Sequence, residues 1–446
     1  MTSISSGSLS MHQSGETPPA GSGHELEPGI GSEIIDCGVL PDTETIHEWP
    51  VLLILAAIQF VHIVDFMMIM PLGPEFLRRY AITPQQFGFL VTVYTFSAAI
   101  CSFLVAFVVD RFDRKHVLVS FCAGFSVATL LCALSVDYLT LLCSRAVAGM
   151  FGGLLSATVF SIIADLIPES RRGKAMGTVM SAFPFAAVAG MPIGLLLVNT
   201  VNWRVPFIVL TILGFLIALR AYRILPKVKP HKSVVHHRGI HRLKFHFNSI
   251  FLNRNHVFAF LLIAMLMFSG YLVIPFISVY MVTNVGMQEA ELPYLYFFGG
   301  LFSFFTANLI GRFTDSYGQR RMFCVLAVLS VVPVLWVTHI SEASIYLALT
   351  ATTLFMILVT GRVIPLMALI TASVRPHLRG SFLTFHMSIQ QLSAGLGSLM
   401  AGYLMVMTVQ GKIVNFDTVG TIAAVITLIG IVLAVQLKTI AELDAQ

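Results

Sequence analysis

About twelve apolar stretches, each long enough to cross a bilayer, constrain this chain more than any other feature. They begin after residue 48 and form two groups of six, separated by a polar segment. About 20 residues of helix cover the hydrocarbon core, and a spanning segment must satisfy its own backbone hydrogen bonds. We therefore predict an all-α membrane protein whose helices span approximately residues 50–73, 84–109, 117–136, 139–164, 175–199, 204–224, 256–283, 292–311, 322–340, 344–370, 381–407 and 419–438.

The composition favours the same class. Of the 446 residues, 57% are hydrophobic and only 11% are charged, and the mean hydropathy is +0.85. Soluble domains are about a quarter charged. The cysteines show no paired spacing, which argues against a disulfide framework or a zinc site. We predict no metal site and no cofactor.

The segments outside the spans are polar and unequal in charge. Residues 1–48 hold eight acids and no Lys or Arg, which predicts a disordered acidic tail. Residues 225–255 are basic and predict a cytoplasmic linker that contacts anionic lipid headgroups, at about 1 kcal/mol per cation. The histidines of this linker match no defined metal-site spacing. The domains are then two six-helix bundles, 49–224 and 256–438, and a short tail, 439–446.

The cations concentrate in alternate loops, which predicts the orientation of the chain. The opposite loops hold only Arg78, Arg79, Arg204 and Lys412. Because positively charged loops stay in the cytoplasm, we expect a multi-pass protein of the cell (plasma or inner) membrane with both termini inside. The predicted cytoplasmic loops hold Arg111, Arg114, Lys115, Arg171, Arg172, Lys174, Arg312, Arg320, Arg321, Arg375 and Arg379.

Two charged loops occupy matching places in the two halves. The first runs from Asp110 to Lys115 and the second from Gly311 to Arg321. An acid followed by two or more cations, repeated in this way, indicates internal duplication. The second loop resembles the Gly-x-x-x-Asp-x-x-Gly-x-Arg-Arg signature of the major facilitator superfamily. It matches that signature at Gly311, Asp315, Gly318, Arg320 and Arg321, whereas the first loop has Ala106 and Asp113 in place of the two glycines.

The resemblance implies two pseudo-symmetric six-helix bundles that rock about a central site. It also implies a conformational gate in the charged loops. Asp110 and Asp315 are expected to cap helix N-termini or to pair with the arginines Arg111, Arg114, Arg320 and Arg321, and Asp165 is expected to join them. The alternative is that these charges serve only to anchor the loops in the cytoplasm.

Asp65 is the sharpest candidate for chemistry, because it lies inside the first predicted span. It stands roughly 22 Å beyond Pro50, at 1.5 Å per residue of helix. An ionisable group in a span costs several kcal/mol unless it faces a cavity or a partner. Gln59 and His62 precede it, and His62 shares its face. We predict that Asp65 exchanges a proton; the alternatives are a structural ion pair and a position near the outer interface.

Arg145 is the predicted partner of Asp65. Arg145 to Gly149, followed by Gly152 and Gly153, resembles the Arg-x-x-x-Gly signature of proton-driven members of the superfamily. The resemblance implies that this arginine tunes the protonation of an acid. We expect it to face Asp65 across the central cavity of the first half. The alternative is a packing arginine bonded to backbone carbonyls.

Further polar residues in the spans are predicted to line the substrate cavity. Arg362, beside Pro365, could bind an anionic group or extend to the inner interface. His386 and Gln390 lie one turn apart in a span whose small residues, Ser393 to Ser398, predict close helix approach. The predicted cavity residues are Gln59, His62, Asn308, Arg362, His386, Gln390 and Gln391.

The fifth span indicates a branch of the superfamily. Gly190, Pro192 and Gly194 are similar to the glycine-proline motif of antiporter members, in which the helix bends against its neighbour. With the Asp65 and Arg145 segments, this favours the bacterial drug and sugar efflux branch.

The predicted function is proton-coupled export of a small molecule, a drug-like compound or a sugar, by a monomer that alternates its access between the two sides. The alternatives are an uptake symporter or facilitator on the same fold, and more remotely a non-transporting sensor. No His-Glu-x-x-His, Gly-x-Ser-x-Gly or nucleotide-binding loop occurs in the sequence, so no enzyme and no ATP-driven pump is predicted. The expected partners are the cargo, protons and lipid, and no nucleic acid.

Overall fold

The computed structural model describes residues 48–108, 113–226, 253–341, 343–375, 378–440 and 442. The acidic tail, most of the basic linker, and Asp110 and Arg111 of the first charged loop lie outside these ranges. The expectations for those segments therefore stay predictions.

The described chain is almost entirely helical, as predicted. The elements of the first half are α1 (Glu48–Met68), α2 (Gly73–Arg79), α3 (Pro84–Val108), α4 (Arg114–Leu134), α5 (Tyr138–Leu166), α6 (Glu169–Met180), α7 (Ala182–Phe185), the π-helix η2 (Ala186–Gly190), α8 (Met191–Thr200) and α9 (Val205–Ile224). Those of the second half are α11 (Arg254–Val273), η3 (Ile274–Phe276), α12 (Ile277–Tyr280), η4 (Met281–Val285), η5 (Glu289–Glu291), α13 (Leu292–Tyr317), α14 (Gln319–His339), α15 (Ile345–Gly361), α16 (Val363–Ala372), α17 (Arg379–Leu404), β1 (Val406–Met407), β2 (Ile413–Val414) and α18 (Phe416–Gln436).

The helices match the predicted membrane spans. Within the described ranges, 11 helical stretches are long and apolar enough to cross a membrane, and the 26-residue helix α17 occupies the remaining predicted span. Several helices carry an exposed apolar stripe, such as Ile212, Leu216 and Leu219 along α9. Their spacing of three and four residues places them on one helix face. A lipid-facing surface requires such a face.

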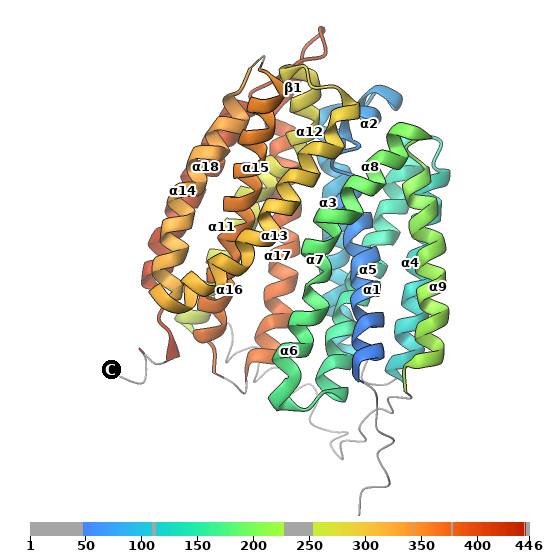
Figure 1. Ribbon diagram of the computed structural model, residues 1–446, viewed down its shortest axis with the longest axis vertical. Helices are drawn as coiled ribbons and strands as arrows, with labels where there is room; N and C mark the ends of the chain where they lie inside the picture. The colour runs from blue at the N-terminus through green and yellow to red at the C-terminus, as the bar shows by residue number, and fades with distance from the viewer. Residues whose placement is uncertain are drawn as a thin grey trace, which may run out of the picture. The chain divides into compact units, whose positions relative to one another are not determined.

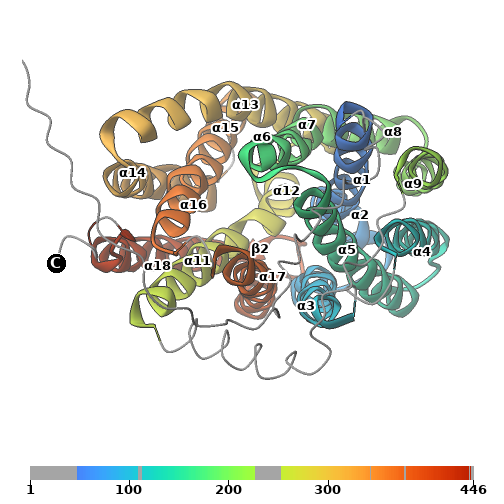
Figure 2. The same cartoon turned by 90° about the horizontal axis from the view of Figure 1, so that it is seen from below.

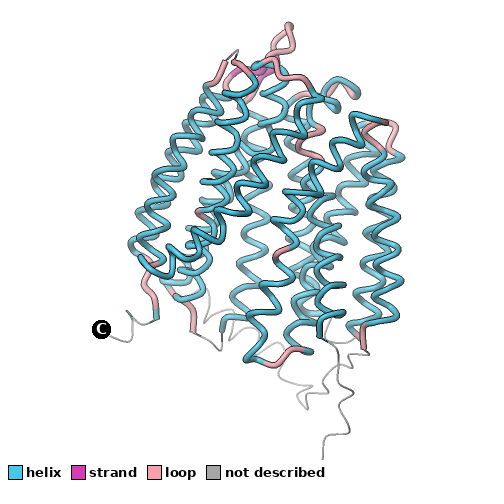
Figure 3. The backbone as a smooth tube through the Cα atoms, in the orientation of Figure 1, coloured by secondary structure: helices cyan, strands magenta, loops and turns pink. Residues whose placement is uncertain are grey.

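The helices form two bundles that meet along a seam. Figure 2 shows α1 to α9 on one side and the helices from α11 to α18 on the other. At the seam, α3 packs against α17, and α13 packs against η2 and α8. The loops gather at the two ends of the bundles (Figure 3). We call these two ends of the molecule the α2 end and the α6 end, after the helices that lie there (Figure 1).

Three of the spans are interrupted near a proline. The π-helix η2 precedes Pro192, the short helix η3 contains Pro275, and Arg362 separates α15 from α16 just before Pro365. Proline has no backbone N–H and its ring clashes with the preceding turn, so a helix tends to kink or break beside it, although α14 continues through Pro333. The first of these breaks lies in the predicted glycine-proline motif.

A small hairpin at the α2 end replaces the predicted end of one span. The sequence predicts helix to residue 407, but α17 ends at Leu404 and β1 pairs with β2 in antiparallel fashion. The side chain of Asn284 fixes this hairpin to η4, because it accepts from the Ile413 amide at 2.9 Å and donates to the Ile413 carbonyl at 2.7 Å.

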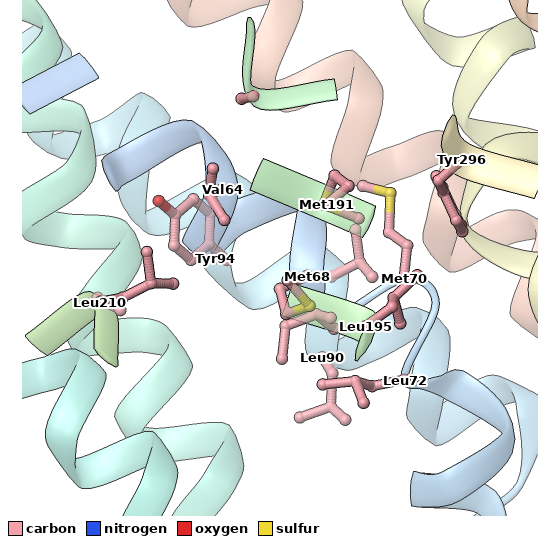
Figure 4. Close-up of a cluster of buried hydrophobic side chains, with 14 of the residues drawn as sticks. Val64, Met68, Met70, Leu72, Leu90, Tyr94, Met191, Leu195, Leu210 and Tyr296 are labelled. Carbon is pink, nitrogen blue, oxygen red and sulfur yellow. The ribbon is translucent and has the colours of Figure 1, made fainter. Parts of the chain in front are cut away.

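Glycines let neighbouring helices approach closely. A Cβ added at Gly149 would lie 2.2 Å from the Tyr94 carbonyl oxygen, and one at Gly153 would lie 2.3 Å from that of Ala98. The backbones of α3 and α5 therefore touch where these glycines stand. In the antiporter-like motif, a Cβ at Gly194 would lie 1.9 Å from Cε of Met68, which lies among side chains of α8 in Figure 4.

The close approach of α3 and α5 predicts that two Gly→Ala substitutions change the free energy of unfolding differently. In Gly153→Ala the added methyl group meets the α3 backbone, and we expect a loss of about 1–3 kcal/mol in the free energy of unfolding. In Gly177→Ala nothing lies within 4 Å of the added Cβ, and we expect a neutral effect or a gain of about 0.4–1 kcal/mol. Thermal unfolding of the purified protein in detergent measures both. Equal melting temperatures would contradict the close approach of α3 and α5.

Candidate functional site

Asp65 and Arg145 form a buried ion pair between α1 and α5. The Nη1 atom of Arg145 donates to Oδ2 of Asp65 at 2.8 Å, and their side chains are 1% and 0% exposed. The hydroxyl of Thr129 in α4 donates to the other carboxylate oxygen at 3.2 Å. The predicted contact between the acid and the arginine is therefore present. The packing alternative, with Arg145 bonded only to carbonyls, is wrong.

The structure explains why a glycine follows four residues after Arg145 in the Arg-x-x-x-Gly sequence. The guanidinium carbon of Arg145 lies 4.3 Å from the ring centroid of Tyr94, within the range of a cation–π contact. Tyr94 belongs to α3, whose backbone reaches this position only because Gly149 has no side chain. The arginine and the glycine one turn later thus form one contact surface for α3.

His62 and Gln59 extend the polar site along α1. The His62 ring lies 6.3 Å from Tyr94 and 5.8 Å from Phe125, between ring centroids. Neither of its nitrogens has a hydrogen-bond partner within the described residues. The side-chain oxygen of Gln59 accepts from the Ser156 hydroxyl at 3.1 Å. The structure therefore joins Gln59, His62, Asp65 and Arg145 in one polar region of the first bundle.

An aromatic stack leads from this site to the second bundle. The ring of Phe66 stacks on Tyr94 with centroids 5.0 Å apart, and on Tyr271 at 6.3 Å. Phe66 follows Asp65 in α1, whereas Tyr271 belongs to α11. The sequence analysis missed Tyr94 and Tyr271, because an aromatic residue in an apolar span gives no signal of its own.

The predicted cavity residues of the second half do not join the Asp65 site. Arg362 is 1% exposed and its Nη1 donates to hydroxyls of Ser330, at 2.9 Å, and Thr427, at 3.0 Å. Of the two alternatives for Arg362, extension to the inner interface is therefore wrong, and binding of an anionic group stays a prediction. His386 is buried next to Phe382.

The amide side chains of the second half are more accessible than Arg362. Gln390 and Gln391 are half-buried in α17, and Asn308 is exposed on α13. Their role as cavity-lining groups stays a prediction.

The first charged loop is held within the first bundle. Asp113 caps α4, since its carboxylate accepts from the Lys115 amide at 3.0 Å. Arg114 pairs with Asp165 of α5, as the sequence led us to expect. Its Nη1 also donates to the Ser161 carbonyl at 3.2 Å. In this loop the capping acid stands where the signature has its second glycine.

Within the described residues, the second charged loop has no acid that caps the following helix, unlike the first. Gly318, between α13 and α14, has a φ of 90°. Residues with a side chain rarely adopt such a positive φ, so the glycine of the signature is needed there. It is also the N-cap of α14, which has no side-chain cap. The expected capping role of Asp315 is therefore wrong, because this exposed residue lies in the last turn of α13. Gly311 has open space around it, and Arg312 and Arg321 are exposed.

Arg320 ties the second loop to the end of α18. Its Nη2 donates to the Leu437 carbonyl at 2.7 Å and to the Glu442 carboxylate at 2.6 Å. The hydrogen bond from Arg320 lowers the pKa of Glu442 to about 2. This contact lies within the second half of the chain and does not bridge the bundles.

An ion pair at the α2 end does bridge the bundles, and the sequence analysis missed it. Arg78 of α2 donates to Glu289 of η5 at 2.6 Å and also pairs with Glu75 of its own helix. The hydrogen bond that Arg78 donates to the Glu289 carboxylate is the main reason that the pKa of Arg78 is raised. At the α6 end, the ion pairs within the described ranges each join residues of one half: Arg114–Asp165, Arg171–Glu48, Arg320–Glu442 and, when His116 is protonated, His116–Asp113.

The seam between α3 and α17 is also tight towards the α2 end. The Thr92 hydroxyl donates to the Gly395 carbonyl at 2.9 Å, and the Ser398 hydroxyl donates to the Gly88 carbonyl at 3.2 Å. A Cβ at Gly88 would lie 2.6 Å from the Ser398 carbonyl. The predicted close approach at the small residues of α17 is confirmed.

Comparison with known proteins gives the family. The family model described as the Major Facilitator Superfamily matches residues 55–398 and 259–442. The chain belongs to this superfamily. Its relatives include YwfA of Bacillus subtilis (strain 168), an uncharacterized MFS-type transporter that is 24% identical over 88% of this chain and 94% of its own length.

Two further matches concern sugars. A probable sugar efflux transporter of Mannheimia succiniciproducens is 24% identical over 32% of this chain and 36% of its own length. The crystal structure of a D-xylose-proton symporter has a TM-score of 0.73 at 14% identity, over 90% of this chain and 99% of that one. At this identity the symporter supports the fold alone.

The ion pair between Arg78 and Glu289 predicts that its removal makes the seam of this major facilitator protein more accessible to solvent. We expect Glu289→Gln to weaken the closed α2 end and to raise the labelling rate of a thiol placed at the buried seam position by Ser398→Cys. An exposed ion pair contributes about 0–1 kcal/mol, so the rate should rise by up to about fivefold. A membrane-impermeant thiol reagent measures it, in a background with the native cysteines replaced by serine.

Glu75→Gln is the matched control for this measurement. It removes the acid that pairs with Arg78 inside α2 and leaves the bridge to η5 in place. An equal rise in both variants would show that the bridge between the bundles does not hold the seam.

Proposed function

We propose that this major facilitator protein exports a small molecule, a drug-like compound or a sugar, in exchange for protons. The observation that carries the proposal is the buried ion pair of Asp65 and Arg145, which connects through stacked aromatic rings to the second bundle. In this scheme Asp65 carries the proton and Arg145 is its charge partner.

The pair suits proton coupling because its two charges depend on each other. When a proton neutralises Asp65, Arg145 keeps a buried charge without a counterion. Breaking one side of a buried pair costs about 3–5 kcal/mol, so the arginine must move or find another partner. Protonation thus becomes a conformational signal rather than a local event.

The aromatic stack gives this signal a route to the seam. Arg145 lies on Tyr94, Tyr94 stacks on Phe66, and Phe66 stacks on Tyr271 of the second bundle. A shift of the guanidinium removes a contact from the first ring of this series. We infer that the series biases which end of the seam is closed, as alternating access requires.

The charge distribution supports an orientation for this conformation. The described cations concentrate at the α6 end, which favours a cytoplasmic location for that end. The α2 end would then face outwards, and Arg78–Glu289 and the α3–α17 contacts would close it. A state closed outside and not bridged by described ion pairs inside is suited to receive cargo from the cytoplasm.

His62 is the proposed proton relay. It stands one turn before Asp65, and both of its ring nitrogens lack partners within the described residues. An imidazole can accept a proton on one nitrogen and release one from the other. Gln59, Gln390, Gln391 and Asn308 are the proposed hydrogen-bonding groups for a polar cargo.

Asp65→Asn tests the proposal. Asparagine keeps the size of the side chain and a hydrogen-bond acceptor for Arg145, but it cannot carry the proton. We expect proton flux coupled to cargo to be lost in proteoliposomes while the protein stays folded. The cargo is chosen from a screen of amphipathic cations, sugars, nucleosides and anions that quench an imposed proton gradient.

Asp417→Asn is the matched control, because Asp417 is an exposed acid in the first turn of α18. If Asp65→Asn does not fold, the double substitution Asp65→Asn with Arg145→Gln removes both buried charges and takes its place. Undiminished proton-driven transport in either variant would remove Asp65 from the mechanism.

Uptake symport is the second candidate, favoured by the fold that the chain shares with the D-xylose-proton symporter. Inverted vesicles with an imposed pH gradient separate the two. Because the cytoplasmic face is outside in such vesicles, an exporter accumulates cargo when the interior is acidic. Proton-driven loss of cargo from those vesicles would establish symport instead.

A further inference from the structure

Arg362 is a buried charged residue that has no role in the proposed transport mechanism. Its side chain is 1% exposed and lies where α15 ends and α16 begins. Arginine stays protonated in proteins. A full positive charge is therefore enclosed among helices that cross the membrane, where a charge without a partner is costly.

The two buried arginines differ in their partners. Arg145 in the first bundle pairs with the carboxylate of Asp65, from α1. Arg362 stands on the corresponding helix of the second bundle, and none of the ion pairs in the described ranges contains it. Its hydrogen-bond partners are the hydroxyls of Ser330, from α14, and Thr427, from α18.

These hydroxyls orient the guanidinium but cannot neutralise it. The Ser330 hydroxyl donates to the Ala327 carbonyl at 2.8 Å, and the Thr427 hydroxyl donates to the Ala423 carbonyl at 2.9 Å. Ser269 of α11, the counterpart helix of α1, contributes a third hydroxyl, 2.7 Å from that of Thr427. The second bundle thus has neutral oxygens where the first has a carboxylate.

The helix ends at Arg362 do not supply the missing charge either. A helix C-terminus carries about half a negative charge and an N-terminus about half a positive one. Because α15 ends at Gly361 and α16 begins at Val363, the two contributions meet at Arg362 and largely cancel. Among the described residues no acid pairs with this guanidinium, so its counter-charge has to come from another group.

One donor of Arg362 is available for such a group. Its Nε is buried and has no hydrogen-bond partner within the described residues, and an unmet buried donor is itself unfavourable. We propose that Arg362, oriented by Ser330 and Thr427, binds a compact monovalent anion. Chloride and the carboxylate of an acidic solute share this chemistry.

Thermal unfolding of the full-length protein in detergent tests the site. The buffer anion, a bulky sulfonate, is replaced stepwise at constant ionic strength by chloride or, separately, by acetate. We expect the melting temperature to rise with saturation, by about 3 °C or more once the anion exceeds its dissociation constant a hundredfold. The tryptophan fluorescence reports unfolding.

Two substitutions separate binding at Arg362 from a general salt effect. In Arg362→Gln the charge is gone, and the rise should disappear. In Ser330→Asp a fixed carboxylate replaces the anion, so the protein should be more stable without added anion and insensitive to it. If Arg362→Gln does not fold, Ser330→Asp decides alone.

Chloride and acetate distinguish the two possible kinds of ligand, an inorganic ion and the carboxylate of an acidic solute. A rise with chloride alone identifies an inorganic ion, a rise with acetate alone identifies an acidic solute, and a rise with both shows a site that accepts either. A melting temperature of the natural protein that neither anion changes would overturn the proposal. So would an unchanged response in Arg362→Gln or in Ser330→Asp.

Discussion

The ion pair between a carboxylate and a guanidinium inside the first bundle is the contact on which the proposed function depends. Each charge alone would be costly in the membrane, and together they are tolerated only while their atoms stay at 2.8 Å. Thr129 and Tyr94 complete this environment. The pair and these two residues thus connect four helices, α1, α3, α4 and α5, and in the proposed mechanism one proton on Asp65 changes their arrangement.

The seam between the bundles depends on a different constraint, the absence of side chains. Glycines and small residues let α3 reach both α5 and α17, so backbone carbonyls lie where a Cβ would otherwise stand. Dispersion and interhelical hydrogen bonds hold such contacts, because lipid provides no hydrophobic drive for helices to associate.

The two bundles share an architecture but not a charge balance. In the first, the buried arginine has an acid; in the second, Arg362 has hydroxyls. The two charged loops diverge in the same way, since Asp113 caps α4 whereas Gly318 adopts a positive φ before α14. A duplicated fold has therefore kept its helix order while the chemistry of its halves has separated.

The sequence by itself determined the class of fold, the approximate spans, the repeated charged loops and which ionisable residues lie inside the spans. These follow from the bilayer, which demands long apolar helices and makes each buried charge conspicuous. Only the tertiary structure decided which charges meet. The ion pairs of Asp65 with Arg145 and of Arg78 with Glu289 join residues far apart in the chain.

The stack through Phe66 and the hydroxyl partners of Arg362 depend likewise on how helices pack against one another. Aromatic and hydroxyl side chains are ordinary inside spans, so no pattern marked them in advance. Periodicity fixes which face of a helix a residue occupies, but it does not say which helix that face meets.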